Sequence, residues 1–186
     1  GTVCFSESFE SLSVGLQRSF WQLGGVPCQH QTDRMSAAVN KPDTPEKFTR
    51  QYQALLSHYN VQGRMINASR PHENGDIEQR HYRFKKAVDQ ALMLRGSRDF
   101  TDRKEYEAFL QKLFSQLNQG RQERFAQEQK TLRPLPSKKM DTCTRFNIRV
   151  GPSSTIRIKH QVYSVNSRLI KEVVNVKLYA EYLEVW

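Results

Sequence analysis

The sequence predicts an α/β unit followed by a small antiparallel β unit. From residue 6 to residue 95, short extended stretches alternate with amphipathic segments, which is the order of an α/β layer architecture. Beyond residue 140 the hydrophobic period changes from that of a helix to that of a strand, which indicates strands with one buried face. A Pro-containing stretch at 134–139 lies between the two patterns and indicates a linker.

The first element is an amphipathic helix over residues 6–23, which ends at Gly24 and Gly25. Its apolar residues recur at steps of three and four: Phe9, Leu12, Leu16, Phe20 and Leu23. The next segment, 26–32, favours extended backbone. We therefore expect a short strand that places Asp33 at its C-terminal end.

A second helix and strand are expected after the loop at 40–45. Thr44 can cap the helix and Pro45 can begin it, and the apolar pattern continues to Tyr59. Residues 62–66 are a plausible second strand. The polar, turn-rich stretch 67–75 then leads into a long helix with this apolar seam: Ile77, Phe84, Val88, Ala91 and Leu92.

Two further helices and a set of strands complete the pattern. Asp102 with Glu105 resembles a capping box at the start of a helix that Gly120 ends, and residues 121–132 also favour a helix. The strand pattern that follows alternates at these residues: Phe146, Ile148 and Val150; Ile156 and Ile158; Val162, Tyr163 and Val165; Val174, Val176 and Leu178; Leu183 and Val185. They predict a small antiparallel sheet or barrel.

Charge and composition indicate which kinds of function the chain can have. The net charge is +10, and between Arg121 and Lys177 there are 13 basic residues against 4 acidic ones. A concentrated positive field favours polyanions such as nucleic acid. No apolar run is long enough for a membrane span. The three cysteines lack the spacing of a disulfide framework or zinc site, so we expect a reducing cytoplasm.

Three side chains of the long helix form a candidate site. Glu78, His81 and Lys85 share one helical face, and Asp33 follows a predicted strand, where α/β sheets often build sites. Two such carboxylates could bind hard cations for phosphoryl transfer. Spacing alone leaves open a solvated Glu–Lys pair, a turn role for Asp33 and a packing role for His81.

Several motifs resemble a known family. Thr32-Asp33, the N-G-x-x-E of 74–78 and Lys85 resemble the second half of a DDE transposase or retroviral-type integrase core. More closely, the segments FESLSVGLQRSFWQLGGVP, TDRMSAAVN, RPHENGDIEQRHYRFKKAVDQAL and YSVNSRLIKEVVNVKLYAEYLEV resemble IstA-type insertion-sequence transposases. The resemblance covers essentially the whole chain. It implies a partial RNase H-like core without its first strands (1–98), a helical connector (99–140) and a small all-β barrel (141–186).

The resemblance also implies roles for single residues. Asp33 matches the second catalytic Asp, Glu78 the catalytic Glu, and Lys85 the basic residue that contacts transposon-end DNA. Glu73 and Asp76 are the rival acids for Glu78. The first catalytic Asp has no counterpart, so this chain is expected to be inactive alone. The intact enzyme would use two magnesium ions, with manganese as a substitute, to cut and join DNA.

The partners expected on the same ground are transposon-end and target DNA, further copies of the chain and an AAA+ helper ATPase, in a bacterial cytoplasm at the nucleoid. Charge and alternation predict that the C-terminal unit contacts DNA through Arg145, Arg149, Arg157 and Lys159, the last two on one face of a strand. The alternative function is a non-catalytic nucleic-acid-binding or assembly module derived from a transposase.

Overall fold

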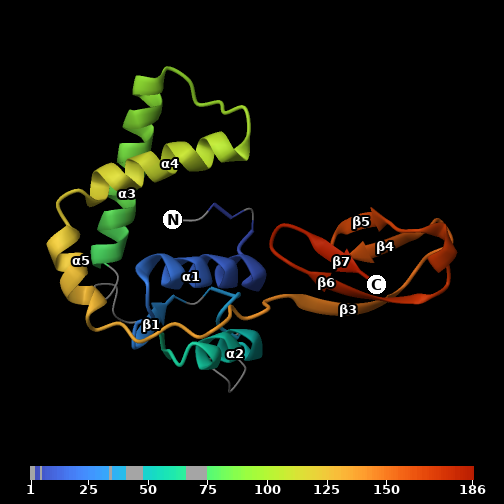
Figure 1. Cartoon of the computed structure of the whole chain (residues 1–186). Coiled ribbons are helices and arrows are strands. Elements are labelled where there is room, and N and C mark those ends of the chain that lie inside the picture. Colours follow the sequence, from blue (N-terminus) through green and yellow to red (C-terminus); the bar gives the residue numbers. More distant parts are fainter. Residues whose placement is uncertain (1–2, 5, 34, 41–47, 66–74) are drawn as a thin grey trace.

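The structure, a computed structural model, describes residues 3–4, 6–33, 35–40, 48–65 and 75–186. Helix α1 (Phe9–Leu23) lies at the centre, with α2 (Arg50–His58) on one side of it. The helices α3 (Gly75–Arg95), α4 (Arg103–Asn118) and α5 (Gln122–Gln129) stand at one end of the molecule, and the C-terminal strands lie at the opposite end (Figure 1). The long chain segment after α5 runs back past α1 to connect the two ends.

Helix α1 forms as predicted. The Ser8 side chain caps its first turn by accepting a hydrogen bond from the Ser11 backbone N–H at 3.3 Å. Gly24 ends it in the left-handed region with φ 74°, a conformation that costs glycine little. The predicted stop is therefore confirmed.

Two short strands form a parallel pair. Strands β1 (Gln29–Thr32) and β2 (Gln62–Met65) are in register from the Gln29–Gln62 pair to the Thr32–Met65 pair. Helix α2 connects them, and Thr49, not Thr44, is its cap, since the Thr49 hydroxyl accepts from the Tyr52 N–H at 3.3 Å. The predicted start at 44–45 lies outside the described residues, and the helix begins at Arg50.

The core of this part joins α1 and α2 with the segments that precede β1 and β2 and the loop after β1. Its buried residues are Phe9, Phe20, Val26, Ala38, Tyr52, Leu55, Leu56, Tyr59 and Val61. The Tyr59 ring packs edge-on against Phe20 with centroids 5.1 Å apart, and its hydroxyl donates to the buried Gln17 side chain at 2.6 Å. Gln17 is thus a buried amide with its hydrogen bonds satisfied, which removes the cost of burying it.

Helices α3 and α4 cross and pack against each other (Figure 1). The rings of Phe84 and Phe114 stack between them with centroids 4.8 Å apart. Asp102 caps α4 by accepting from the Glu105 N–H at 2.8 Å. The second half of the expected capping box differs, because the Glu105 carboxylate accepts from the Thr101 N–H and from Arg95, each at 2.7 Å, instead of the Asp102 N–H.

The C-terminal strands form open antiparallel sheets. One sheet has the order β3 (Thr144–Arg149), β6 (Val173–Leu178), β7 (Leu183–Val185), and the second pairs β4 (Thr155–Ile158) with β5 (Gln161–Ser164). They enclose a second core made of Val150, Ile156, Ile158, Val174 and Val176. Among the described residues the strands do not close into a barrel, so the barrel remains a prediction.

The predicted linker packs against the N-terminal core. Arg133 and Val26 exchange two backbone hydrogen bonds, at 2.8 and 2.9 Å. The Gln17 amide accepts from the Met140 N–H at 2.8 Å and donates to the Met140 carbonyl at 3.3 Å. This segment is therefore held at both ends. No helix in the described part of the chain is long and apolar enough to cross a membrane.

Candidate nucleic-acid interface

The outer side of the three-stranded sheet carries an exposed polar face. Strand β3 alternates, so that Phe146 and Ile148 point to the core while Arg145, Asn147 and Arg149 are exposed. The antiparallel register places β6 residues opposite these: Lys177 opposite Arg145, Asn175 opposite Asn147 and Val173 opposite Arg149. Residues at paired positions share a face of the sheet. We call the set Arg145, Asn147, Arg149, Asn175, Lys177 and Trp186 the outer face.

Trp186 belongs to the outer face through its backbone. It exchanges two hydrogen bonds with Asn175, at 2.9 and 3.1 Å, which extends the β6–β7 pairing by one residue. Trp186 is 57% exposed, and the Lys177 ammonium lies 5.2 Å from the centroid of its ring. A cation at this distance from an indole ring is attracted to it. The outer face therefore combines cations, amides and an exposed aromatic ring.

Two acidic residues lie at the outer face: Glu184, which stands opposite Lys177 in the β6–β7 register, and Asp141 at the edge. The Asp141 carboxylate is 3.3 Å from the Lys177 ammonium and 3.8 Å from the Arg145 guanidinium. All three side chains are partly exposed, so these ion pairs contribute little to stability and exchange readily with another anion. Arg149 stands further along β3 and is exposed.

Arg157 and Lys159 do not lie on one face of a strand, although the alternation predicts that they do. Arg157 is exposed between the buried Ile156 and Ile158, as expected. Strand β4 ends at Ile158, however, and Lys159 has φ 54° in the turn that follows. Its ammonium lies 3.7 Å from the buried carboxylate of Glu10 in α1. The prediction that both residues form one ridge is wrong because the turn ends the strand periodicity.

Asp33 lies where the sequence placed it. It follows β1 directly, and because β1 and β2 are parallel, the carboxyl ends of both strands lie at this edge. Asp33 is exposed, and its Oδ1 accepts a hydrogen bond from the Met35 N–H at 3.2 Å. This is a local turn contact that leaves the other carboxylate oxygen available.

Glu78 and Lys85 are exposed on α3, together with His81. Helical geometry places these three on one side of the helix, as predicted. The segment 66–74, which joins β2 to α3, lies outside the described residues, and with it the rival acid Glu73. Asp76 belongs to α3, but its side chain is not among those described.

Asp33 and Glu78 present the oxygen ligands that magnesium prefers, and this donor type fits such an ion. Within the described residues, no group of three or more His, Cys, Asp or Glu side chains gathers closely enough to hold a metal. The two carboxylates alone therefore make an incomplete ligand set.

Four residues of the outer face are not among the contacts predicted from the sequence: Asn147, Asn175, Lys177 and Trp186. A signal for them was present. Along β6, Asn175 and Lys177 alternate with the buried Val174 and Val176. Their side chains therefore point away from the core. Their position beside Arg145 and Arg149 depends on the pairing of β3 with β6, which alternation does not give.

Comparison with known proteins gives two matches. Residues 135–186 match the family described as "Mu transposase, C-terminal domain". The chain is 35% identical over 182 residues to the "Uncharacterized protein y4jA/y4nE/y4sE" of Sinorhizobium fredii, a match that covers 97% of this chain and 36% of that protein. The chain thus spans about a third of the length of this curated relative. Residues 135–186, which contain the C-terminal strands, are thus similar to the C-terminal domain of Mu transposase.

Proposed function

We propose that this chain binds DNA as part of a transposase, and that the outer face contacts the phosphate backbone. The observation that carries the proposal is the coincidence of the outer face with the matched segment, since all six of its residues lie within 135–186. Arg145, Arg149 and Lys177 supply cations at three positions of two neighbouring strands. Such an array suits a polyanion with regularly spaced charges.

The amides and the ring add contacts that charge alone does not provide. Asn147 and Asn175 are directly opposite each other in the centre of the outer face and can donate to phosphate or sugar oxygens. Trp186 can pack against a sugar or base at the edge. In this proposal the outer face acts as one surface, with Arg157 on the neighbouring sheet as an additional cation.

Substitution of the basic residues tests this proposal. Arg145→Gln, Arg149→Gln and Arg157→Gln together should weaken binding to duplex DNA. They should also reduce the slope of log affinity against log salt, by about 0.9 for each phosphate that the variant no longer neutralises. Adding Lys159→Gln should have little further effect, because Glu10 already neutralises that charge.

The matched control removes the same number of charges elsewhere. Lys104, Lys112 and Lys130 are exposed and lie on or beside α4 and α5. Their combined change to Gln should leave the salt slope for duplex DNA unchanged. Equal losses in both triple variants would mean that only net charge matters and would refute the role of the outer face.

We further propose that the parent protein is a DDE transposase of the IstA type with an RNase H-like core. The supporting observation is the place of Asp33 at the carboxyl end of a parallel strand, which is where α/β folds position reactive groups. Asp33 and Glu78 would hold magnesium with a further carboxylate, and Lys85 would contact DNA at the site. Magnesium would supply activation of the attacking oxygen and stabilisation of the leaving oxygen. Assembly with further copies and an AAA+ helper belongs to the same proposal.

Metal binding can be measured without activity. Manganese is paramagnetic and should broaden the NMR signals of residues next to both Asp33 and Glu78. The change Asp33→Asn should reduce the broadening at both places, because one ion is shared. Broadening that is independent at the two residues, or absent, would favour the alternative of a non-catalytic DNA-binding module.

A further inference from the structure

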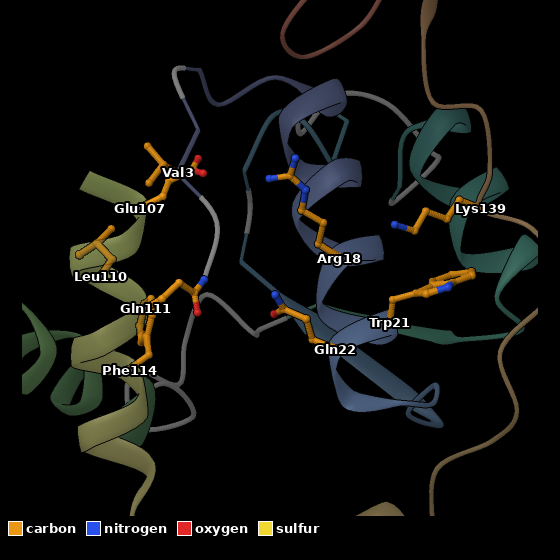
Figure 2. A pocket seen from close by; sticks show the side chains of 9 residues that line it. All are labelled: Val3, Arg18, Trp21, Gln22, Glu107, Leu110, Gln111, Phe114 and Lys139. Atoms are coloured by element: carbon orange, nitrogen blue, oxygen red, sulfur yellow. The ribbon is translucent and has the colours of Figure 1, made fainter. Parts of the chain in front are cut away.

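A groove lies between α1 and the helices α3, α4 and α5, away from the outer face. It consists of three adjoining hollows with volumes of about 930, 850 and 500 Å³. Phe114 of α4 lines all three, and Arg80 and Arg121 line the two larger ones. Figure 2 shows the smallest hollow, where Gln22 of α1 and Gln111 of α4 point toward one another.

The arginines of α3 that line the groove lie on the side of the helix opposite to Glu78 and Lys85. With 3.6 residues per turn, Arg80, Arg83 and Phe84 lie on the far side of the helix from Glu78 and Lys85. These three residues line the largest hollow, and so does His81 of the candidate site, whereas neither Glu78 nor Lys85 does. The groove arginines of α3 are therefore separate from Glu78 and Lys85, and His81 lies between the two sets.

Basic side chains outnumber acidic ones along the groove. The smallest hollow is lined by Arg18 and Lys139 and by one acid, Glu107. The described residues that line the largest hollow include Arg80, Arg83 and Arg121 and no acidic side chain. The second hollow adds Arg124 and one acid, Glu128, which lies 3.2 Å from the Arg124 guanidinium. Three guanidinium groups thus face the groove without a carboxylate within ion-pair distance among the described residues.

Aromatic side chains line the same groove. Phe84, Tyr106 and Phe114 are partly exposed at the largest hollow, and Phe125 is 36% exposed at the second. Basic grooves with aromatic walls are typical of sites for single-stranded nucleic acid, in which cations follow the backbone and bases pack on rings. Each hollow has the size of a small-ligand site, so together they suit a few nucleotides of one strand and not a duplex.

We propose that this groove binds single-stranded DNA, with phosphates at Arg80, Arg83 and Arg121. The inference rests on the proposed function in that the chain acts on DNA, but it assigns a second surface with a different ligand. In this inference the groove holds a single strand while the outer face holds the duplex.

The experiment measures binding of a labelled oligothymidine of about 16 nucleotides, the upper end of common site sizes, and of a duplex, across a range of salt. Arg80→Gln, Arg83→Gln and Arg121→Gln together should weaken oligothymidine binding at least tenfold and lower its salt slope by about 2, or about 0.7 for each phosphate. Duplex binding should change less than twofold. The control variant of Lys104, Lys112 and Lys130 should change neither.

A second variant tests the groove in case the arginine variant does not fold. Phe125→Ala removes an exposed ring at the groove without a change of charge, and it should weaken oligothymidine binding severalfold at an unchanged salt slope. Unchanged oligothymidine binding in the arginine variant, or an equal loss in the lysine control, would overturn the inference. If instead the outer-face variant leaves duplex binding intact while the arginine variant loses oligothymidine, the proposed function fails and the groove assignment stands.

Discussion

The hydroxyl of Thr144 donates a hydrogen bond of 2.5 Å to Glu10 Oε1, which connects the first residue of β3 to the first turn of α1. Glu10 is only 3% exposed, and its other oxygen lies 3.7 Å from the Lys159 ammonium. A buried carboxylate is stable only when such partners replace its water. Glu10 therefore sets how the C-terminal strands attach to the N-terminal core.

Glu10→Gln should weaken this attachment. Burial alone would raise the pKa of Glu10, but hydrogen bonds from Thr144, its own backbone and Ser8, with the charge of Lys159, outweigh burial and lower the pKa below 4.5. Since the pKa is lower in the folded state, this carboxylate stabilises the fold above pH 4.5, and the stabilisation is lost as pH falls through the folded-state value. We expect the variant to lose about 1–3 kcal/mol near neutral pH, as measured by urea unfolding.

The free energy of unfolding of the Glu10→Gln variant should change less with pH than that of the parent chain, because Gln does not titrate. Thr144→Val removes one hydrogen bond but keeps the carboxylate and should show an intermediate loss of stability. Identical unfolding midpoints for all three proteins between pH 3 and neutrality would contradict the proposed role.

His30 should make the fold sensitive to mild acid. Its ring nitrogen Nδ1 lies 2.6 Å from the Tyr52 hydroxyl, and burial lowers the pKa of His30 below 6.5 while it raises the pKa of Tyr52 to about 12. A His with a lowered pKa stabilises the fold above pH 6.5, and stability falls as pH drops toward the folded-state value. Urea midpoints at successive pH values would reveal this.

His160 provides a control for the effect of His30 on the pH dependence of stability. His160 is exposed, so His160→Gln should keep the pH dependence of the parent chain, whereas His30→Gln should flatten it between about pH 5 and 7. Equal profiles for the two variants would show that burial of His30 contributes nothing.

Substitution by Ala should have opposite effects on stability at Gly25 and at Gly15. A Cβ at the buried Gly25 would lie 2.6 Å from the Leu132 Cβ and 3.0 Å from the Arg133 carbonyl oxygen, so Gly25→Ala must push the segment after α5 away from the core. We expect a loss of about 1–3 kcal/mol. At Gly15 in α1 nothing lies within 4 Å of an added Cβ, so Gly15→Ala should stabilise the protein by up to about 1 kcal/mol. Thermal unfolding measures both, and a stable Gly25→Ala protein would show that this packing is loose.

Lys85→Gln should hardly change binding to random duplex DNA. Lys85 is exposed on α3, away from the outer face, and lines none of the three hollows of the groove. In our proposal it contacts only DNA that is positioned at Asp33 and Glu78. A tenfold loss of affinity for random duplex would instead place Lys85 on the general DNA-binding surface.

Much of the local structure could be predicted from the sequence. Alternation at Phe146 and Ile148, and at Val174 and Val176, gave the strands and the side of each that faces the core. Helical periodicity and Gly24 gave the bounds of α1 to within a few residues. These features succeed because burial of one face depends on neighbours a few residues apart.

The tertiary structure decided the rest. It paired β3 with β6 instead of with its neighbour in sequence, which brought Lys177 and Asn175 beside Arg145 and Asn147 to make the outer face. It turned Lys159 toward Glu10, and it placed Arg80 and Arg121 on one groove from different segments of the chain. Each of these contacts joins residues far apart in the chain, and local periodicity determines only which way a side chain points, not which distant segment it meets.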